Sequence, residues 1–87
     1  MDKDTYNQRL SELRRKRDNE EENRKKDNAY YRERIREAAK DPIRKMDYES
    51  EKRRCEMQHE MQFERYKLEI SMLKAQYAME ECRNKGR

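Results

Sequence analysis

The fold of this chain is decided by residues 42–84, which read PIRKMDYESEKRRCEMQHEMQFERYKLEISMLKAQYAMEECRN. The stretch contains no glycine, and its single proline is its first residue, a position that suits proline at the start of a helix. Apolar residues recur in it at helical spacing rather than in strict alternation. The stretch therefore predicts one long α-helix, around which the rest of the chain is organised.

The predicted helix has two apolar sides. Successive residues lie about 100° apart around a helix, and on this basis one side gathers Met57, Met61, Leu68, Met72, Ala75, Met79 and Cys82. The opposite side, roughly 180° away, gathers Cys55, His59, Phe63, Tyr66, Ile70, Leu73 and Tyr77. A helix with one apolar side can complete its burial in a hairpin, whereas a helix with two opposite apolar sides needs neighbours in both directions.

This pattern predicts a protein partner or self-association into a homo-oligomer. The residues expected to bind that partner come from both sides of the helix: Met57, Met61, Leu68, Met72, Met79, Phe63, Tyr66, Ile70, Leu73 and Tyr77. Methionine is unbranched and polarizable, so a surface rich in it adapts well to a partner helix.

The amino-acid composition favours long helices over a compact core. Leu, Ile, Val and Phe together number only eight of the 87 residues, which is few for a chain that builds a core of its own. Ala, Glu, Lys, Leu and Arg number 47, about the half that is typical of long helices and coiled coils. We therefore expect an all-α fold, either a helical hairpin or an extended coiled-coil-like rod, within an oligomer or a larger assembly.

The chain divides at Lys40–Pro42. A residue before proline is pushed away from the helical conformation, and Asp41 is a good N-cap for a helix that begins at Pro42. Residues 1–41 are expected to form a charged N-terminal helix or helices, and residues 42–87 the long two-sided helix of a single structural unit. Gly86 is expected to stop that helix.

The N-terminal part has weaker signals. Thr5 and Gln8 fit a capping box that would begin its helix. Residues 14–28 are wholly polar. Asp27 or Asn28 is suited to cap a new helix, so the sequence allows a break or kink at these two residues. A short turn at Lys40–Pro42 allows an antiparallel hairpin.

The hairpin register follows from the position of that turn. It pairs residue i with roughly residue 82 − i, which brings Leu10 near Met72. In this register the polar residues 14–28 cover the long helix poorly.

The distribution of charge argues against the hypothesis that the chain binds nucleic acid. The chain has 24 basic and 20 acidic residues and a net charge of +4, and the basic residues of the N-terminal half are spread around the helix with acidic residues between them. Phosphate binding needs basic groups gathered on one side. We therefore expect a solvated charged helix whose acidic groups, such as Glu20, can be neutralised with little effect. A small basic helical bundle that binds nucleic acid is the first alternative.

The cysteine content and the apolar runs bear on location. Two cysteines 27 residues apart are too few for the disulfide framework of a small secreted domain, so free thiols and a cytoplasmic or other reducing compartment are expected. The N-terminal sequence Met-Asp-Lys-Asp lacks the apolar region of a signal peptide, and no apolar run is long enough for a membrane span. We therefore expect a protein that is neither secreted nor embedded in a membrane.

Candidate chemical sites are sparse. Cys55 and His59, and also Met57 and Met61, are four residues apart and could share a metal ion, but two ligands do not make a site. We interpret all four as packing residues and expect neither a metal nor a cofactor. One histidine and no glycine-rich loop indicate a non-enzyme. A small helical inhibitor or regulator of a larger enzyme is the second alternative.

Overall fold

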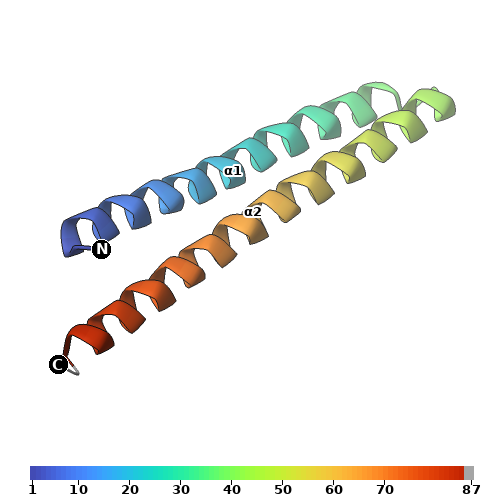
Figure 1. The fold of residues 1–87 in the computed structure, drawn as a ribbon. Coiled ribbons are helices and arrows are strands. Elements are labelled where there is room, and N and C mark those ends of the chain that lie inside the picture. The colour runs from blue at the N-terminus through green and yellow to red at the C-terminus, as the bar shows by residue number, and fades with distance from the viewer. Residues whose placement is uncertain (86–87) are drawn as a thin grey trace.

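The computed structural model describes residues 1–85, so the predicted helix stop at Gly86 lies outside the described residues. Helix α1 runs over Lys3–Glu37 and helix α2 over Pro42–Lys85. The two helices are antiparallel, with both termini at one end of the molecule and the turn at the other (Figure 1). The molecule measures 71 × 16 × 10 Å. The predicted all-α fold is confirmed in its hairpin form.

Helix α1 begins earlier than the sequence predicted. Asp2 is its N-cap, and one carboxylate oxygen of Asp2 accepts a hydrogen bond from the Thr5 backbone N–H at 2.7 Å. This hydrogen bond lowers the pKa of the Asp2 carboxyl. The capping box at Thr5 and Gln8 was therefore wrong. Aspartate caps as well as threonine does, and its negative charge also complements the positive end of the helix dipole.

Helix α1 is also continuous, without a break at Asp27 or Asn28. Both residues are half-buried, and the carboxylate of Asp27 contacts α2 instead of capping a new helix. A side chain that already has a partner across the hairpin gains nothing by interrupting the backbone hydrogen bonds of its own helix.

The turn lies where Lys40–Pro42 predicted it. The backbone N–H of Ala38 donates to the Arg34 carbonyl oxygen at 3.0 Å, which closes α1, and Ala38 is buried. Asp41 then caps α2, because its carboxylate accepts from the Arg44 N–H at 3.3 Å. Pro42 follows as the first residue of α2.

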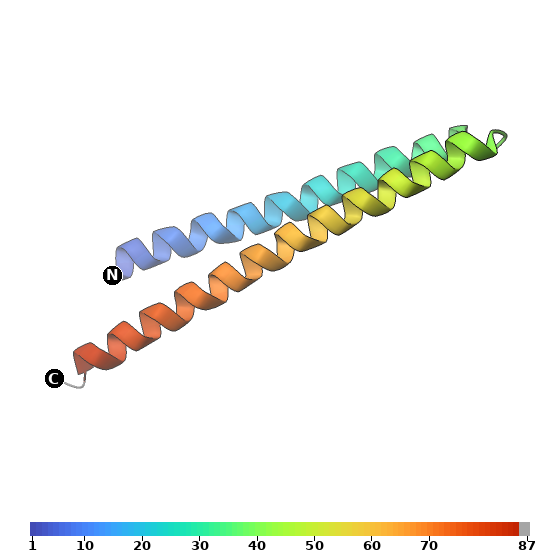
Figure 2. The same cartoon turned by 45° about the vertical axis from the view of Figure 1, so that its right-hand side comes forward.

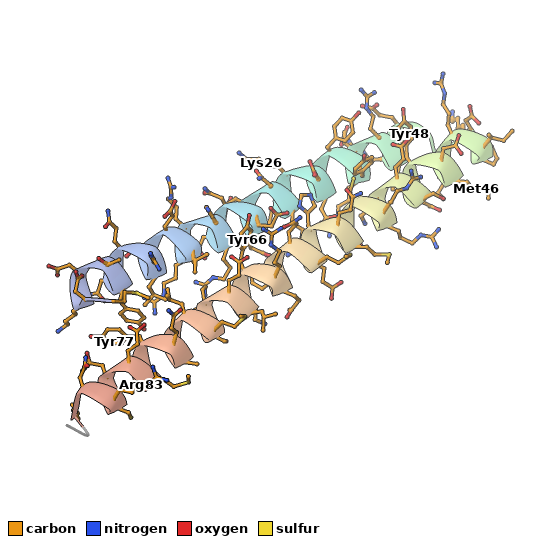
Figure 3. All side chains as sticks on the ribbon, viewed as in Figure 1. Lys26, Met46, Tyr48, Tyr66, Tyr77 and Arg83 are labelled. Atoms are coloured by element: carbon orange, nitrogen blue, oxygen red, sulfur yellow. The ribbon has the colours of Figure 1, made fainter. Side chains whose placement is uncertain are left out.

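The core of the hairpin is small and lies near its open end, the end at which both termini lie. Leu10, Ile70 and Leu73 are buried together, and Met1, Tyr6 and Leu13 pack against them. Tyr77 stacks on Tyr6 with the ring centroids 4.1 Å apart, and Figure 3 shows Tyr77 between the two helices. These contacts join the first turns of α1 to the last third of α2.

The register agrees with the prediction to within about one helical turn. Tyr6 contacts Tyr77, Glu20 contacts His59 and Tyr31 contacts Cys55, so the helices stay side by side along α1, as both views show (Figures 1 and 2). The rotation of α2 differs in one detail. Leu10 packs on Ile70 and Leu73, while Met72 is exposed on the other side of α2.

Candidate interaction surface

Helix α2 presents its two apolar sides to different surroundings. We call the side toward α1 the inner face; its residues are Cys55, His59, Phe63, Tyr66, Ile70, Leu73 and Tyr77. We call the opposite apolar side the outer face; its large side chains are Met57, Met61, Leu68, Met72 and Met79. All five side chains of the outer face are between 60 % and 70 % exposed.

The outer face is a continuous apolar strip with polar edges. One shallow groove of about 640 Å³ is lined by Met57, Glu60, Met61, Glu64, Arg65 and Leu68. A second of about 500 Å³ continues it and is lined by Leu13, Glu69, Met72, Leu73, Ala75, Gln76 and Met79. Exposed apolar strips rimmed by charged residues are typical of protein–protein contact sites.

The inner face supplies the other five predicted partner residues. Ile70 and Leu73 are buried in the core, and Phe63, Tyr66 and Tyr77 are half-buried. One of the two neighbours that the sequence required is therefore α1 itself. Within residues 1–85, neither helix covers the outer face.

A histidine holds the polar middle of the hairpin together. The His59 ring lies between two carboxylates of α1, with Nδ1 2.5 Å from Glu20 and Nε2 2.6 Å from Asp27. Both ring nitrogens can donate only in the imidazolium form. Hydrogen bonds to Asp27 and Glu20 raise the pKa of His59, and partial burial opposes them only in part.

Glu20 and Asp27 are contact residues that the sequence analysis missed. Glu20 was expected to be an interchangeable charge, but its side chain is largely buried against His59. The available signal was the register, because Glu20 and Asp27 lie about two turns apart on one side of α1 and flank the position opposite His59.

The two cysteines are free and lie in different environments. Cys55 is half-buried on the inner face, with its sulfur 3.5 Å from the Tyr31 hydroxyl. This hydrogen bond raises the pKa of Tyr31 to about 12. His59 uses both nitrogens for α1 carboxylates rather than for a site shared with Cys55. Cys82 is exposed on the outer side of α2.

Within residues 1–85, no three side chains of histidine, cysteine, aspartate or glutamate are arranged to hold a metal ion. Neither helix, over the same residues, has a stretch with the length and apolar character of a membrane span.

The outward side of α1 differs from the outer face of α2. Its charges pair locally along the helix, with Lys25 3.7 Å from Glu22 and Arg36 2.6 Å from Glu33. Lys26 points away from α2 in Figure 3. Acidic and basic groups alternate over this surface, so α1 presents a solvated exterior while α2 presents an apolar one.

Comparison with known proteins adds no relationship: the chain matches no family model, and neither a curated protein nor a solved structure is significantly similar to it.

Proposed function

We propose that this chain is a non-enzymatic structural or interaction protein that binds a protein partner through the outer face of α2. One observation carries the proposal. Seven large apolar side chains of α2 are at least 60 % exposed, five of them on the outer face, whereas only Leu10, Ala38, Ile70 and Leu73 are buried among residues 1–85. The outer face thus exposes more large apolar side chains than the hairpin buries within residues 1–85.

The energetics favour covering this surface. Burial of one Leu or Met side chain contributes about 1.5–3 kcal/mol, so covering five that are mostly exposed gives a gross gain of about 5–10 kcal/mol. Association costs roughly 4–15 kcal/mol in lost freedom. The outer face therefore supports stable binding when the partner brings apolar side chains of its own, and it suits a second helix better than a polar surface.

The composition of the outer face supports the same conclusion. Four of its five large side chains are methionines, whose flexible chains fill the gaps of an irregular partner surface. Charged residues such as Glu60 and Arg65 stand at the edges of the strip, where they remain solvated and select the partner's orientation.

A comparison of two variants tests the proposal. Leu68→Asp places a charge in the middle of the outer face, and Ala29→Asp makes an equivalent change at an exposed position of α1. We expect both to keep the helical circular dichroism spectrum of the wild type. We expect Leu68→Asp alone to lose self-association and the capture of specific proteins from the native source. An unchanged set of partners for Leu68→Asp contradicts the proposal.

The nucleic-acid alternative has a different signature. Phosphate contacts make affinity fall steeply with salt, whereas an apolar contact changes little. RNA or DNA binding that weakens steeply with salt and is untouched by Leu68→Asp therefore supports the alternative.

A further inference from the structure

We propose that the partner of the outer face is a second copy of this chain, with α2 antiparallel to α2 of the copy and the twofold axis at Lys67. This inference rests on the proposed function of the outer face and specifies its occupant. In such a pair, residues that lie equally far before and after Lys67 face each other across the axis, and each contact occurs twice.

The charges of α2 match themselves in this arrangement. The facing pairs in which both residues are charged are Glu49 with Lys85, Glu51 with Arg83, Arg53 with Glu81, Arg54 with Glu80, Glu60 with Lys74 and Arg65 with Glu69. All six combine opposite signs. An antiparallel twofold pair brings each edge of the interface against its own copy, and helical spacing places both members of every pair on the same side of the midline of the outer face. Glu81 lies furthest from that midline, toward the inner face, and is half-buried.

Residues from two of these facing pairs already form ion pairs inside the hairpin. Arg65 lies 3.3 Å from Glu69 of the same helix, so the twofold axis joins two such pairs into a network of four charges. Glu80 accepts from the Met1 amino group at 2.9 Å, and Arg54 of the copy adds a second cation to that carboxylate.

Between residues 49 and 85, the only like-charged facing pair is Lys67 with its own copy. Each Lys67 is 3.4 Å from Glu64 of its own helix, which offsets that repulsion.

The apolar residues interlock in the same register. Met57 faces the gap between Ala75 and Met79 of the copy, and Met61 faces the gap between its Met72 and Ala75. Each side chain therefore enters a space between two side chains of the opposite helix, as in knobs-into-holes packing. The two Leu68 side chains meet beside the axis.

Other arrangements lose the charge match. In a parallel pair in register each residue lies at the level of its own copy, and near the middle of the interface this brings Glu64 close to Glu64 and Arg54 close to Arg54. Moving the antiparallel axis by one residue, from Lys67 to Leu68, breaks all six of these pairs, so that Glu60 faces Gln76 and Arg65 faces Ser71. Like charges facing each other across a helix pair oppose association. The antiparallel pair centred on Lys67 avoids these contacts.

This pair leaves both hairpins intact, because α1 covers the inner face and the copy covers the outer face. The assembly is a row of four helices in the order α1, α2, α2 of the copy, α1 of the copy. Both neighbours that the two-sided helix requires are then present.

Charge exchange tests the pairing. Glu60 and Lys74 are both exposed and form no ion pair within the part of the chain that the structure describes. Glu60→Lys alone sets two lysines against each other twice per dimer, and Lys74→Glu alone does the same with glutamates. We expect each variant to dimerise at least tenfold more weakly than wild type, by light scattering across a concentration series in moderate salt.

The decisive measurement mixes these two variants. A heterodimer of Glu60→Lys with Lys74→Glu restores opposite charges at both contacts, so we expect it to form with wild-type affinity where neither variant pairs with itself. Glu12→Lys, an equal charge change at an exposed position of α1, serves as the control and keeps full dimerisation. Single variants that dimerise like wild type, or a mixture that stays monomeric, overturn the proposed register.

Cross-linking tests the orientation. In a Cys55→Ser background, Ser50→Cys places a thiol on the outer face two residues from position 52, which lies opposite native Cys82 of an antiparallel copy. Mild oxidation followed by peptide mass spectrometry is expected to yield a cross-link between positions 50 and 82. Cross-links only between identical positions indicate a parallel pair and overturn the proposal.

The two proposals fail separately. A wild-type chain that is monomeric at all concentrations overturns the homodimer, while the proposed function fails only if Leu68→Asp also retains every protein partner.

Discussion

The inner and outer faces of α2 contain similar residues but meet different environments. Leu68 and Ile70 are two positions apart in the sequence, yet Leu68 is 60 % exposed and Ile70 only 6 %. The inner face is covered because α1 supplies Tyr6, Leu10 and Leu13 to its apolar end. Apolar content alone therefore does not decide which side of a two-sided helix is buried within the chain; that depends on which side the neighbouring helix matches.

The inner face itself changes character along its length. At the open end it is an apolar core, and in the middle it depends on the contact of His59 with Glu20 and Asp27. Residues 14–28 of α1 have no apolar side chain to offer, so charge-assisted hydrogen bonds replace packing there. The stability of the hairpin is therefore expected to depend on side-chain volume at the open end and on pH in the middle of the inner face.

The largest effect is expected from Ile70→Asp. It places a carboxylate in the small core, where a buried charge without a partner costs several kcal/mol, about 3–5. Because few other residues are buried, we expect the hairpin to lose its cooperative unfolding in urea, followed by circular dichroism at 222 nm. A variant with wild-type stability would show that the cluster around Leu10 does not hold the helices together.

Leu68→Asp is the matched change on the outer face. Because Leu68 is exposed in the hairpin, we expect the free energy of unfolding of the monomer to change by only about 0.5 kcal/mol. Assembly, measured by size-exclusion chromatography with light scattering, is expected to disappear. If Leu68→Asp instead unfolds the monomer, the outer face also stabilises the hairpin, and the contrast with the inner face is wrong.

The pH dependence of the stability of the hairpin tests the contact of His59 with Glu20 and Asp27. The pKa of His59 is raised in the folded state, so the folded chain binds more protons than the unfolded chain between the two pKa values. The resulting stability is fully present below the unfolded pKa of about 6.5 and is lost as pH rises through the folded pKa. We expect urea midpoints to fall from pH 6 to pH 8.5 in wild type and to lose this His59 component in His59→Gln.

The carboxylate partners of His59 refine this test. Asp27→Asn or Glu20→Gln removes one charged acceptor, and each is expected to cost about 1 kcal/mol at pH 6 and less at pH 8.5. Glu22→Gln, an exposed acid of the same section, is the control and is expected to change little at either pH. Equal losses for all three variants would indicate a general charge effect.

The smallest effect concerns the two thiols. Cys82 is exposed on the outer side of α2 and Cys55 is half-buried on the inner face beside Tyr31. At a concentration at which light scattering shows a monomer, we expect a maleimide to label Cys82 several-fold faster than Cys55. Peptide mass spectrometry of partially labelled chain measures the ratio. Equal rates would mean that the hairpin opens readily along its length.

Some contacts could be predicted from the sequence because their signals are local. Pro42 and Asp41 marked the turn, and helical periodicity showed that α2 has two apolar sides. The register followed from the turn, since two straight antiparallel helices leave little freedom once the connection is short. The cap at Asp2 was missed because Asp2 and Thr5 are both good N-caps, and residue type does not distinguish them.

The sequence by itself thus determined the long helix α2, the turn before it and the presence of two apolar sides on α2, because all of these depend on residue spacing along one chain. It left open whether α1 continues through Asp27 and Asn28. Only the tertiary structure decided which side α1 covers and that His59 lies between Glu20 and Asp27. The first depends on the rotation of α2 about its own axis, and the second depends also on the rotation of α1. The fifteen polar residues 14–28 carry no apolar stripe to specify that rotation, so it emerges only when the ends of α1 pack against α2.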